Sequence, residues 1–364
     1  RQAFANDVAE GKSDAIYNTH SYHTKVPPKA IVRYILHYTE PGDLVFDGFC
    51  GTGMTGVAAQ LCASKDSVES LGYKVSSGGK ISDSAGLEFS TLGPRRTALI
   101  DLCPAATLIT HGYNTAIDSS EFKTLAECIL AEVESDCEWM YRTRHLGKDQ
   151  YGLIDYMVWS DVSLCGECSA EILLWDALID PATKRRLPGT KLNCPTCSAE
   201  QSSRSLARVM ETYVDFSDGT PRQRNKQVPV LIAYRHDGKK FEKSPDADDY
   251  EILSKVEEEI RTCSLWYPDV DLPDGLRRTK DAYHLRGISR THHFYLRRAL
   301  LAFARIWDKC SCVEGRQGRQ LQFWAQSVAL GFTRMNRYFE SSYSQVNRYM
   351  KGTLYVAPFI SEVR

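Results

Sequence analysis

The 364-residue chain contains no long apolar run, no leader sequence and no internal repeat. No stretch approaches the roughly 18 apolar residues of a membrane-spanning helix, and no basic segment followed by an apolar one opens the chain. These absences exclude an integral membrane protein and a conventionally exported one, and predict a cytoplasmic location. The chain begins Arg1-Gln2-Ala3 without an initiator methionine, which favours a fragment of a longer protein.

The composition is that of an ordinary globular protein, with 43% hydrophobic and 25% charged residues. Its length predicts two or three domains rather than one small core. Twelve cysteines are present, and only four of them form two CxxC pairs. In a chain without a leader, this usage fits a reducing compartment with one metal site better than a disulfide framework.

The net charge of −1 conceals a strong asymmetry along the chain. Residues 275–351 contain 15 lysines and arginines against 4 acidic residues, a net charge of +11, so the remainder carries −12. A basic segment on an otherwise acidic chain predicts a polyanionic partner. The alternative is a solvated helical surface with no such partner.

The order of apolar, glycine-rich and polar stretches predicts an α/β protein with three regions. Residues 1–148 read as strands alternating with helices, interrupted at 64–92 by a Ser- and Gly-rich insertion that resembles a hairpin or loop. Residues 149–245 form a β-rich cysteine module, and residues 246–364 a basic, mainly helical region. A long amphipathic helix is expected to begin near Ser119 or Ser120 and to end at Gly147.

The most informative stretch is a glycine-rich turn. A short apolar strand at 44–46 ends at Asp47, and the turn leads into a helix. Glycines let the backbone turn sharply and approach a ligand, the helix N-terminus offers unpaired N–H groups, and ligands of open α/β sheets bind at the carboxyl ends of strands. A tight structural turn without a ligand fits the same pattern. The turn contains Gly48, Phe49, Gly51, Gly53, Thr55 and Gly56.

A second strand at 98–102 carries Asp101 near its end. This carboxylate could accept both ribose hydroxyls of a nucleoside cofactor, and the usual separation from the first glycine is about 20 residues. The separation is longer here, which the insertion at 64–92 explains. The alternative role for Asp101 is a surface cap of the turn at Cys103. The glycine-rich string at 46–53 lacks the Lys-Ser/Thr of a P-loop, which argues against a nucleoside triphosphate site there.

Upstream of the turn, Pro27-Pro28 sets an extended entry into a helix at 30–38. The strings HSYHTKVPP, DGFCGTGMTG and IDLCPAA, in this order, resemble DNA amino-methyltransferases, and more narrowly the adenine-specific DNA methylases that contain a zinc ribbon. The resemblance implies a partial Rossmann-like sheet that binds S-adenosylmethionine, and transfer of a methyl group to an exocyclic amine of double-stranded DNA, with adenine N6 favoured. By position, the cofactor would contact Lys25, Pro27, Asp47, Gly48, Phe49, Gly51, Gly53, Thr55 and Asp101.

Two CxxC knuckles, separated by 25 residues, predict a zinc site. Four thiolates close a tetrahedral site with no position left for a substrate, so the zinc would be structural. The ribbon could contact DNA, or it could only hold a loop-rich insertion together. The ligands would be Cys165, Cys168, Cys194 and Cys197.

A basic helix is expected at 290–307. At 100° per residue its arginines fall within one arc of about 100°, and most of its apolar residues face the opposite way. Such a face could grip the DNA backbone, and the alternative is a packed helix with a solvated face. The predicted DNA-binding residues are Arg290, Arg297, Arg298 and Arg305, and Arg277, Arg278, Lys280, Arg286, Arg334, Arg337 and Arg348 extend the same chemistry.

No catalytic residue is assigned, because the motif that holds the flipped-out base is missing. Methylases of the resembling group place an Asp/Asn/Ser-Pro-Pro-aromatic string there, and the only Pro-Pro in the chain, at Pro27-Pro28, has the wrong neighbours. We therefore expect a chain that binds cofactor and DNA but is inactive alone, its catalytic part truncated or on a partner subunit. The alternative is a non-catalytic zinc-ribbon DNA-binding protein with a regulatory or vestigial cofactor pocket. A methyltransferase of RNA or of a small molecule is a weaker third option.

Overall fold

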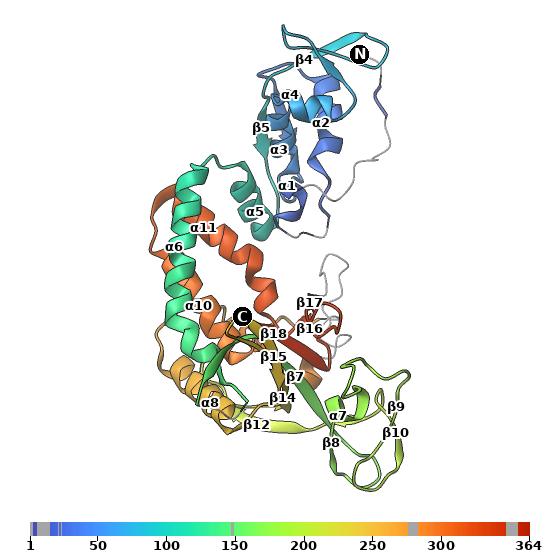
Figure 1. Ribbon diagram of the computed structural model, residues 1–364. Coiled ribbons are helices and arrows are strands. Elements are labelled where there is room, and N and C mark those ends of the chain that lie inside the picture. The colour runs from blue at the N-terminus through green and yellow to red at the C-terminus, as the bar shows by residue number, and fades with distance from the viewer. Residues whose placement is uncertain are drawn as a thin grey trace. The chain divides into compact units, whose positions relative to one another are not determined.

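In a computed structural model the chain divides into two compact units, each described by itself (Figure 1). Unit 1 comprises Arg1–Phe122, Glu314–Ser327 and Tyr349–Gly352, and unit 2 comprises Lys123–Val313, Val328–Arg348 and Thr353–Arg364. None of the helices that the structure describes is long and apolar enough to cross a membrane. The structure describes residues 3–5, 15–20, 22, 24–146, 149–275, 283–346 and 356–364, without the side chains of 345–346.

Unit 1 is built around two parallel strands, β1 (Leu44–Asp47) and β5 (Arg96–Leu99), which pair in register. Helix α3 (Met54–Leu61) follows β1 directly, and it packs with α2 (Pro28–Tyr38) in one apolar core to which Val45 of β1 also contributes. The strand–turn–helix order expected from the sequence is thus present. The unit further contains α1 (Ala15–Asn18), α4 (Lys65–Glu69), β2 (Lys74–Val75), β3 (Lys80–Ser82), β4 (Glu88–Thr91), α5 (Pro104–Asn114) and most of α11 (Gly315–Val328).

The insertion predicted at 64–92 folds as a small element of its own. After the short helix α4, strands β2, β3 and β4 form an antiparallel three-stranded sheet. Its Ile81 is fully buried in the same apolar core as α2 and α3. The insertion therefore lengthens the path between β1 and β5 without separating the two strands.

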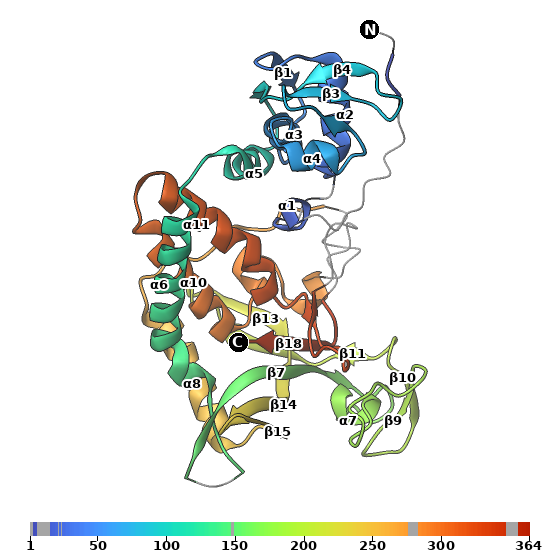
Figure 2. The same cartoon turned by 45° about the horizontal axis from the view of Figure 1, so that its top comes forward.

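Unit 2 is organised by β7 (Tyr151–Leu164), a 14-residue strand that runs from the core of the unit toward the cysteine module (Figure 2). Antiparallel partners line both of its sides, and the sheet order is β15-β14-β7-β18-β16-β17, with β6, β8 and β11 also paired to β7. The partners are β6 (Arg142–Arg144), β8 (Glu171–Leu173), β11 (Ala207–Arg208), β14 (Gln227–His236), β15 (Lys239–Lys243), β16 (Asn336–Arg337), β17 (Gln345–Val346) and β18 (Phe359–Val363).

The unit boundaries differ from the positions 148 and 245 that the sequence suggested. The reason is strand pairing: β7 and β14 lie in the predicted cysteine module, yet β7 pairs with β18 near the C-terminus of the chain.

The helix that begins at Ser119 ends at Cys137, where the sequence predicted an end at Gly147. It is followed by a 3-10 turn and β6, and Gly147 lies outside the described residues. The remaining elements are α6 (Ser119–Cys137), η1 (Glu138–Tyr141), α7 (Leu174–Leu178), β9 (Lys191–Asn193), β10 (Glu200–Ser202), β12 (Met210–Val214), β13 (Pro221–Asn225), α8 (Ala247–Thr262), η2 (Tyr283–Arg286), η3 (Thr291–Phe294), α10 (Arg297–Ser311) and η4 (Ala329–Phe332).

The basic helix expected at 290–307 begins at Arg297 in the structure, as α10, so Arg290 is not on it. Helix α10 is buried around most of its circumference, and its buried residues include Arg298, which the helical periodicity placed on the basic arc. A periodicity argument assigns one face to the core. It fails here because α8 and η4 pack against the helix, and because Arg298 bonds to Met140, Met157 and Glu362, which come from distant parts of the sequence.

Candidate functional site

The glycine-rich turn is held in place by the carboxylate of Asp47, the last residue of β1. One carboxylate oxygen accepts the backbone N–H of Phe49 at 3.1 Å, and the other accepts the hydroxyl of Thr55 at 2.6 Å. Asp47 thereby ties the beginning of the turn to the first turn of α3. The side chains of Asp47 and Thr55, both predicted to contact a cofactor, are engaged with each other.

Two glycines of the turn are required by helix packing. A Cβ at Gly53 would lie 2.6 Å from the Thr110 side chain, and one at Gly56 would lie 2.2 Å from that of Asn114. Both partners belong to α5, which packs on α3. Gly53 also has a φ of 72°, in the left-handed region that favours glycine. These two positions are therefore explained without any ligand.

Gly48 has no such explanation. Its φ is not in the left-handed region, and a Cβ there would meet only the Phe46 ring, at an ordinary contact distance of 3.4 Å. The next residue, Phe49, has a side chain that is 92% exposed. Gly48 and Phe49 thus leave open space beside the carboxyl end of β1, which is where a ligand of a parallel sheet binds.

Asp101 lies just beyond the carboxyl end of β5 and closes the turn from the other side. Its carboxylate accepts the backbone N–H of Gly51 and that of Cys103, each at 2.9 Å. Hydrogen bonds from the backbone of Cys103 and Gly51 lower the pKa of Asp101, so the side chain is ionised at neutral pH. The hydrogen bond from Cys103 is the surface cap that the sequence suggested as the alternative role of Asp101. Each carboxylate oxygen keeps a second lone pair, which can accept a hydrogen bond from a hydroxyl group.

The lead-in to α2 is anchored by Lys25. Its buried ammonium donates to the backbone carbonyl of His20 at 2.9 Å, to the hydroxyl of Tyr113 at 2.7 Å, and to the carbonyl of Tyr17. Three donors on the ammonium meet three acceptors of the protein. Pro27 is buried and caps α2. In this structure Lys25 supports the lead-in, and its contact with a cofactor stays a prediction.

Three residues near the turn were not singled out from the sequence. Thr110 donates to the carbonyl of Gly51 at 3.0 Å, and Asn114 donates to that of Gly53 at 3.1 Å. The ring of Tyr22 lies 3.7 Å from the position of a Cβ on Gly51. Tyr22 belongs to the HSYHTKVPP string, whereas Thr110 and Asn114 reach the turn from α5, which is distant in sequence and carries no recognised motif.

The four cysteines of the two CxxC pairs come together in unit 2. The first pair lies in the turn between β7 and β8, and the second in the turn between β9 and β10. The Sγ atoms of Cys165 and Cys197 are 3.7 Å apart, those of Cys168 and Cys194 are 3.6 Å apart, and all four lie within 4.8 Å of one another. With metal–sulfur bonds of about 2.3 Å, a tetrahedral zinc site has S–S edges of about 3.8 Å. The cluster could therefore hold a tetrahedral metal ion.

The two knuckles share one local geometry. Both have the sequence Cys-x-x-Cys-Ser-Ala, and Ser169 and Ser198 each have a φ of 61°. The serine N–H donates to the carbonyl of the first cysteine in each turn, at 3.0 and 2.9 Å. The backbone N–H groups of Cys197 and Thr196 lower the pKa of the Cys194 thiol to about 6. At Cys194 these groups favour the thiolate, which is the form that binds a metal, whereas the neighbouring thiols raise the pKa of Cys168 and of Cys197.

A second group of potential ligands, Asp215, His292 and His293, is fully buried in unit 2. Nδ1 of His293 accepts the backbone N–H groups of Ser289 and Arg290, both at 3.2 Å. Burial lowers the pKa of His293 to about 4, so its ring is neutral at pH 7 and carries its one proton on Nε2. Nε2 then donates to Asp215 at 2.7 Å and has no lone pair for a metal. The group is a hydrogen-bonded network.

The arginines predicted to bind DNA are engaged inside unit 2. Arg298 is 2% exposed, and its guanidinium lies 2.6 Å from the carboxylate of Glu362. The side chains of Arg290, Arg297 and Arg305 are 17%, 13% and 16% exposed, and each has an acidic partner. The partners are Asp269 and Asp271 for Arg290, Glu257 for Arg297 and Glu259 for Arg305.

The other basic residues of this region differ in their burial and in their partners. Arg286 pairs with Asp161 at 2.9 Å, Arg334 is buried, and Arg337 is partly exposed beside the ring of Phe339. Arg277, Arg278, Lys280 and Arg348 lie outside the described residues. Contact of this region with DNA stays a prediction, and Arg298 has no surface to offer to a phosphate in this structure.

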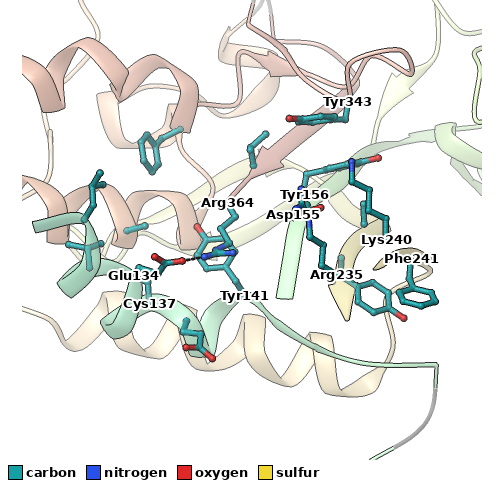
Figure 3. Close-up of a pocket in the computed structure, with 18 of the residues that line it drawn as sticks. Glu134, Cys137, Tyr141, Asp155, Tyr156, Arg235, Lys240, Phe241, Tyr343 and Arg364 are labelled. Carbon is teal, nitrogen blue, oxygen red and sulfur yellow. Dashed lines mark hydrogen bonds and ion pairs between the residues drawn. The ribbon is translucent and has the colours of Figure 1, made fainter. Parts of the chain in front are cut away.

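A cavity of about 850 Å³ in unit 2 is lined by residues other than those predicted to contact cofactor, zinc or DNA (Figure 3). The rings of Tyr156 and Tyr343 stack on one wall with centroids 4.9 Å apart. Two of its charged groups are neutralised within the wall, Arg235 by Asp155 at 3.0 Å and Arg364 by Glu134. Neither pair offers a net charge to a ligand.

Comparison with known proteins gives one match. A family model described as DNA methylase matches residues 5–79, which contain the lead-in, β1 and the glycine-rich turn. No curated protein and no solved structure matches the chain. The match supports a DNA methyltransferase at the level of the family, and S-adenosylmethionine is the methyl donor that such a family implies.

Proposed function

We propose that this chain supplies the S-adenosylmethionine-binding part of a DNA methyltransferase that acts on an exocyclic amine, with adenine N6 as the target. The observation that carries the proposal is the arrangement around the glycine-rich turn, inside the segment that the DNA methylase family matches. Asp47 and Asp101 stand at the carboxyl ends of two adjacent parallel strands, and at Gly48, next to Asp47, a Cβ would meet only the Phe46 ring. Bound there, the cofactor would supply a methyl group on a positively charged sulfur.

The residues present fit such a cofactor. Asp101 is ionised and keeps lone pairs for ribose hydroxyls, Gly48 lacks the side chain that would fill the space, and Phe49 offers an exposed ring. The turn itself is pre-organised by Asp47 and by two side chains from α5. Little ordering is then required when a ligand binds, which favours affinity.

In the part of unit 1 that the structure describes, one face of the sheet is apolar and exposed. Val45 of β1 packs into the core, while its neighbours Leu44 and Phe46 are 60% and 67% exposed, and Ile100 and Leu102 beside them are 56% and 97% exposed. Parallel sheets of α/β proteins are normally covered on both faces. This face supports the view that further strands or helices, from this polypeptide or from a partner subunit, complete the domain and carry the catalytic motif.

We also propose that Cys165, Cys168, Cys194 and Cys197 bind a structural zinc ion. The support for DNA as the substrate is the family match. The arginines of α10 do not add to it, because their guanidinium groups face carboxylates.

The second candidate function is a non-catalytic DNA-binding protein with a regulatory cofactor pocket. The observation in its favour is the sequence itself, which contains no Asp-Pro-Pro-Tyr-type string.

Calorimetry with S-adenosylmethionine, followed by a transfer assay, tests the main proposal. We expect the 364-residue chain to bind the cofactor but to transfer no tritiated methyl group to duplex DNA, because its sequence contains no Asp-Pro-Pro-Tyr-type string to hold the flipped base. Silent calorimetry would refute the cofactor site. Label in the DNA would refute the assignment of catalysis to another segment.

A pair of glycine substitutions separates ligand contact from packing. Gly48→Ala is expected to weaken S-adenosylmethionine binding at least about tenfold with an unchanged melting temperature, since the new Cβ meets only the Phe46 ring. Gly56→Ala is expected to lower the melting temperature, because its Cβ would lie 2.2 Å from Asn114. Binding is measured by calorimetry and stability by thermal denaturation.

Gly78→Ala is the matched control for both measurements. This glycine lies in unit 1, away from the turn, and a Cβ there would come no closer than 4.0 Å to the Ser76 side chain. Affinity and melting temperature should both remain at the wild-type values. Undiminished cofactor binding by Gly48→Ala would show that no ligand approaches this position.

A further inference from the structure

A second cavity in unit 2, of about 400 Å³, has the size of a small-ligand site. Aromatic rings form part of its wall, among them Trp159 of β7 and Tyr213 of β12. Burial raises the pKa of Tyr295, a third ring of the wall, to about 12, so the ring remains uncharged. Flat rings beside a cavity of this size are suited to stacking on a planar group.

Four arginines line this cavity, and three of them have their own glutamate. Each of these three pairs is neutral as a unit, so together they add little net charge to the cavity. The pairs are Arg224 with Glu211 at 2.7 Å, Arg297 with Glu257 at 3.2 Å, and Arg298 with Glu362 at 2.6 Å.

The fourth arginine, Arg334, has no carboxylate within ion-pairing distance among the described residues. It is 6% exposed, and its guanidinium donates only to neutral oxygens: the backbone carbonyl of His293 at 3.2 Å, Asn225 at 3.1 Å and Gln227 at 2.7 Å. Its Nε has no hydrogen-bond partner. A buried charge without a counter-charge is costly, and buried charges are normally paired.

The positive charge at Arg334 persists at neutral pH. Burial, together with the nearby Arg286, lowers its pKa to about 9, which still leaves the guanidinium protonated at pH 7. The carboxylate of Asp161 is the acidic group that favours the charged form, but it is bound to Arg286 at 2.9 Å. The wall of the cavity thus carries one uncompensated positive charge.

We propose that this cavity binds the phosphate ester of a nucleoside, with Arg334 as the counter-charge of the phosphate and the aromatic wall beside the base. The inference concerns a site in unit 2 that cofactor binding in unit 1 does not require. The same chemistry is offered by a free nucleoside monophosphate and by one nucleotide of a nucleic acid chain. Phosphate recognition by a guanidinium and stacking of bases on aromatic rings are general modes of nucleotide binding.

The test compares ligands that differ only in the phosphate. Binding of deoxyadenosine monophosphate, deoxyadenosine and inorganic phosphate to the full chain is measured by calorimetry and by phosphorus NMR. We expect the monophosphate to bind at least tenfold more tightly than deoxyadenosine. Equal binding of the two, or no binding of either, would overturn the proposal. Displacement of the monophosphate by a single-stranded oligonucleotide assigns the site to nucleic acid, and retention assigns it to a free nucleotide.

Arg334→Gln tests the role of the charge. The variant is expected to lose at least tenfold in affinity for the monophosphate while its affinity for deoxyadenosine is unchanged. Arg235→Gln is the control, because this arginine is exposed and paired with Asp155 outside the cavity. If Arg334→Gln does not fold, the ratio of the two affinities in the wild type still decides. S-adenosylmethionine binding, measured in the same samples, separates this proposal from the proposed function.

Discussion

Replacing Glu362 by glutamine is expected to destabilise unit 2 by about 3–5 kcal/mol. Glu362 and Arg298 have side chains that are each 1% exposed, with 2.6 Å between the carboxylate and the guanidinium. The carboxylate also accepts the indole N–H of Trp159 at 2.9 Å, and Arg298 donates to the carbonyl of Met140. Loss of the negative charge leaves a buried guanidinium without compensation. The free energy of unfolding is measured by urea denaturation followed by tryptophan fluorescence.

The matched control is Glu200→Gln. Glu200 pairs with Lys191 at 2.7 Å, but the two side chains are 61% and 75% exposed, so the loss should be below about 1 kcal/mol. Replacing Arg298 and Glu362 together by Met and Leu should recover much of the stability lost in the single variant, because no buried charge is left unpaired. A single variant as stable as the wild type would show that Arg298 is not an internal support.

The second large effect is expected from Cys194→Ser, in the cluster of four cysteines. The wild type should contain about one zinc ion per chain and the variant almost none, because a structural zinc site needs all four ligands. Residues 165–206 should then become sensitive to proteases, since Cys165 and Cys194 belong to an apolar core with Trp175. Metal content is measured by atomic emission, and cleavage by limited proteolysis.

Cys128→Ser is the control for this experiment. Cys128 is exposed on α6 and lies outside the cluster, so its replacement should change neither the zinc content nor the pattern of cleavage. Zinc retained at the wild-type level in Cys194→Ser would contradict the ligand assignment. A wild-type chain that binds no zinc after refolding with the metal would contradict the site altogether.

Local sequence was a reliable guide wherever local chemistry fixes the backbone. The turn after β1 lies where its glycines predicted, the insertion at 64–92 is a hairpin-containing sheet, and each CxxC pair sits in a β-turn. These features depend on residues within a few positions of one another. The side chains that hold the turn from α5 could not be found in this way, because Thr110 and Asn114 are about 60 residues away from it.

The role of each glycine was also beyond the sequence. Gly48, Gly53 and Gly56 look alike in a pattern of glycines. The structure separates them, because Gly53 and Gly56 face α5 at distances that exclude a Cβ, whereas a Cβ at Gly48 would meet only the Phe46 ring at 3.4 Å. Only the packing of α3 on α5 decides which glycine is available to a ligand.

The sequence by itself determined the short-range features of this protein: the βα turn with its two aspartates, the two cysteine knuckles and the resemblance to DNA methylases. Tertiary structure decided which of the charges are paired. The excess of +11 in residues 275–351 suggested a surface for a polyanion, yet Arg286, Arg297, Arg298, Arg305 and Lys309 each meet a carboxylate from another segment. The physical reason is that charges pair through space, so a segment rich in one sign can be neutralised by acids more than a hundred residues away, and the sequence order does not record which acid that will be.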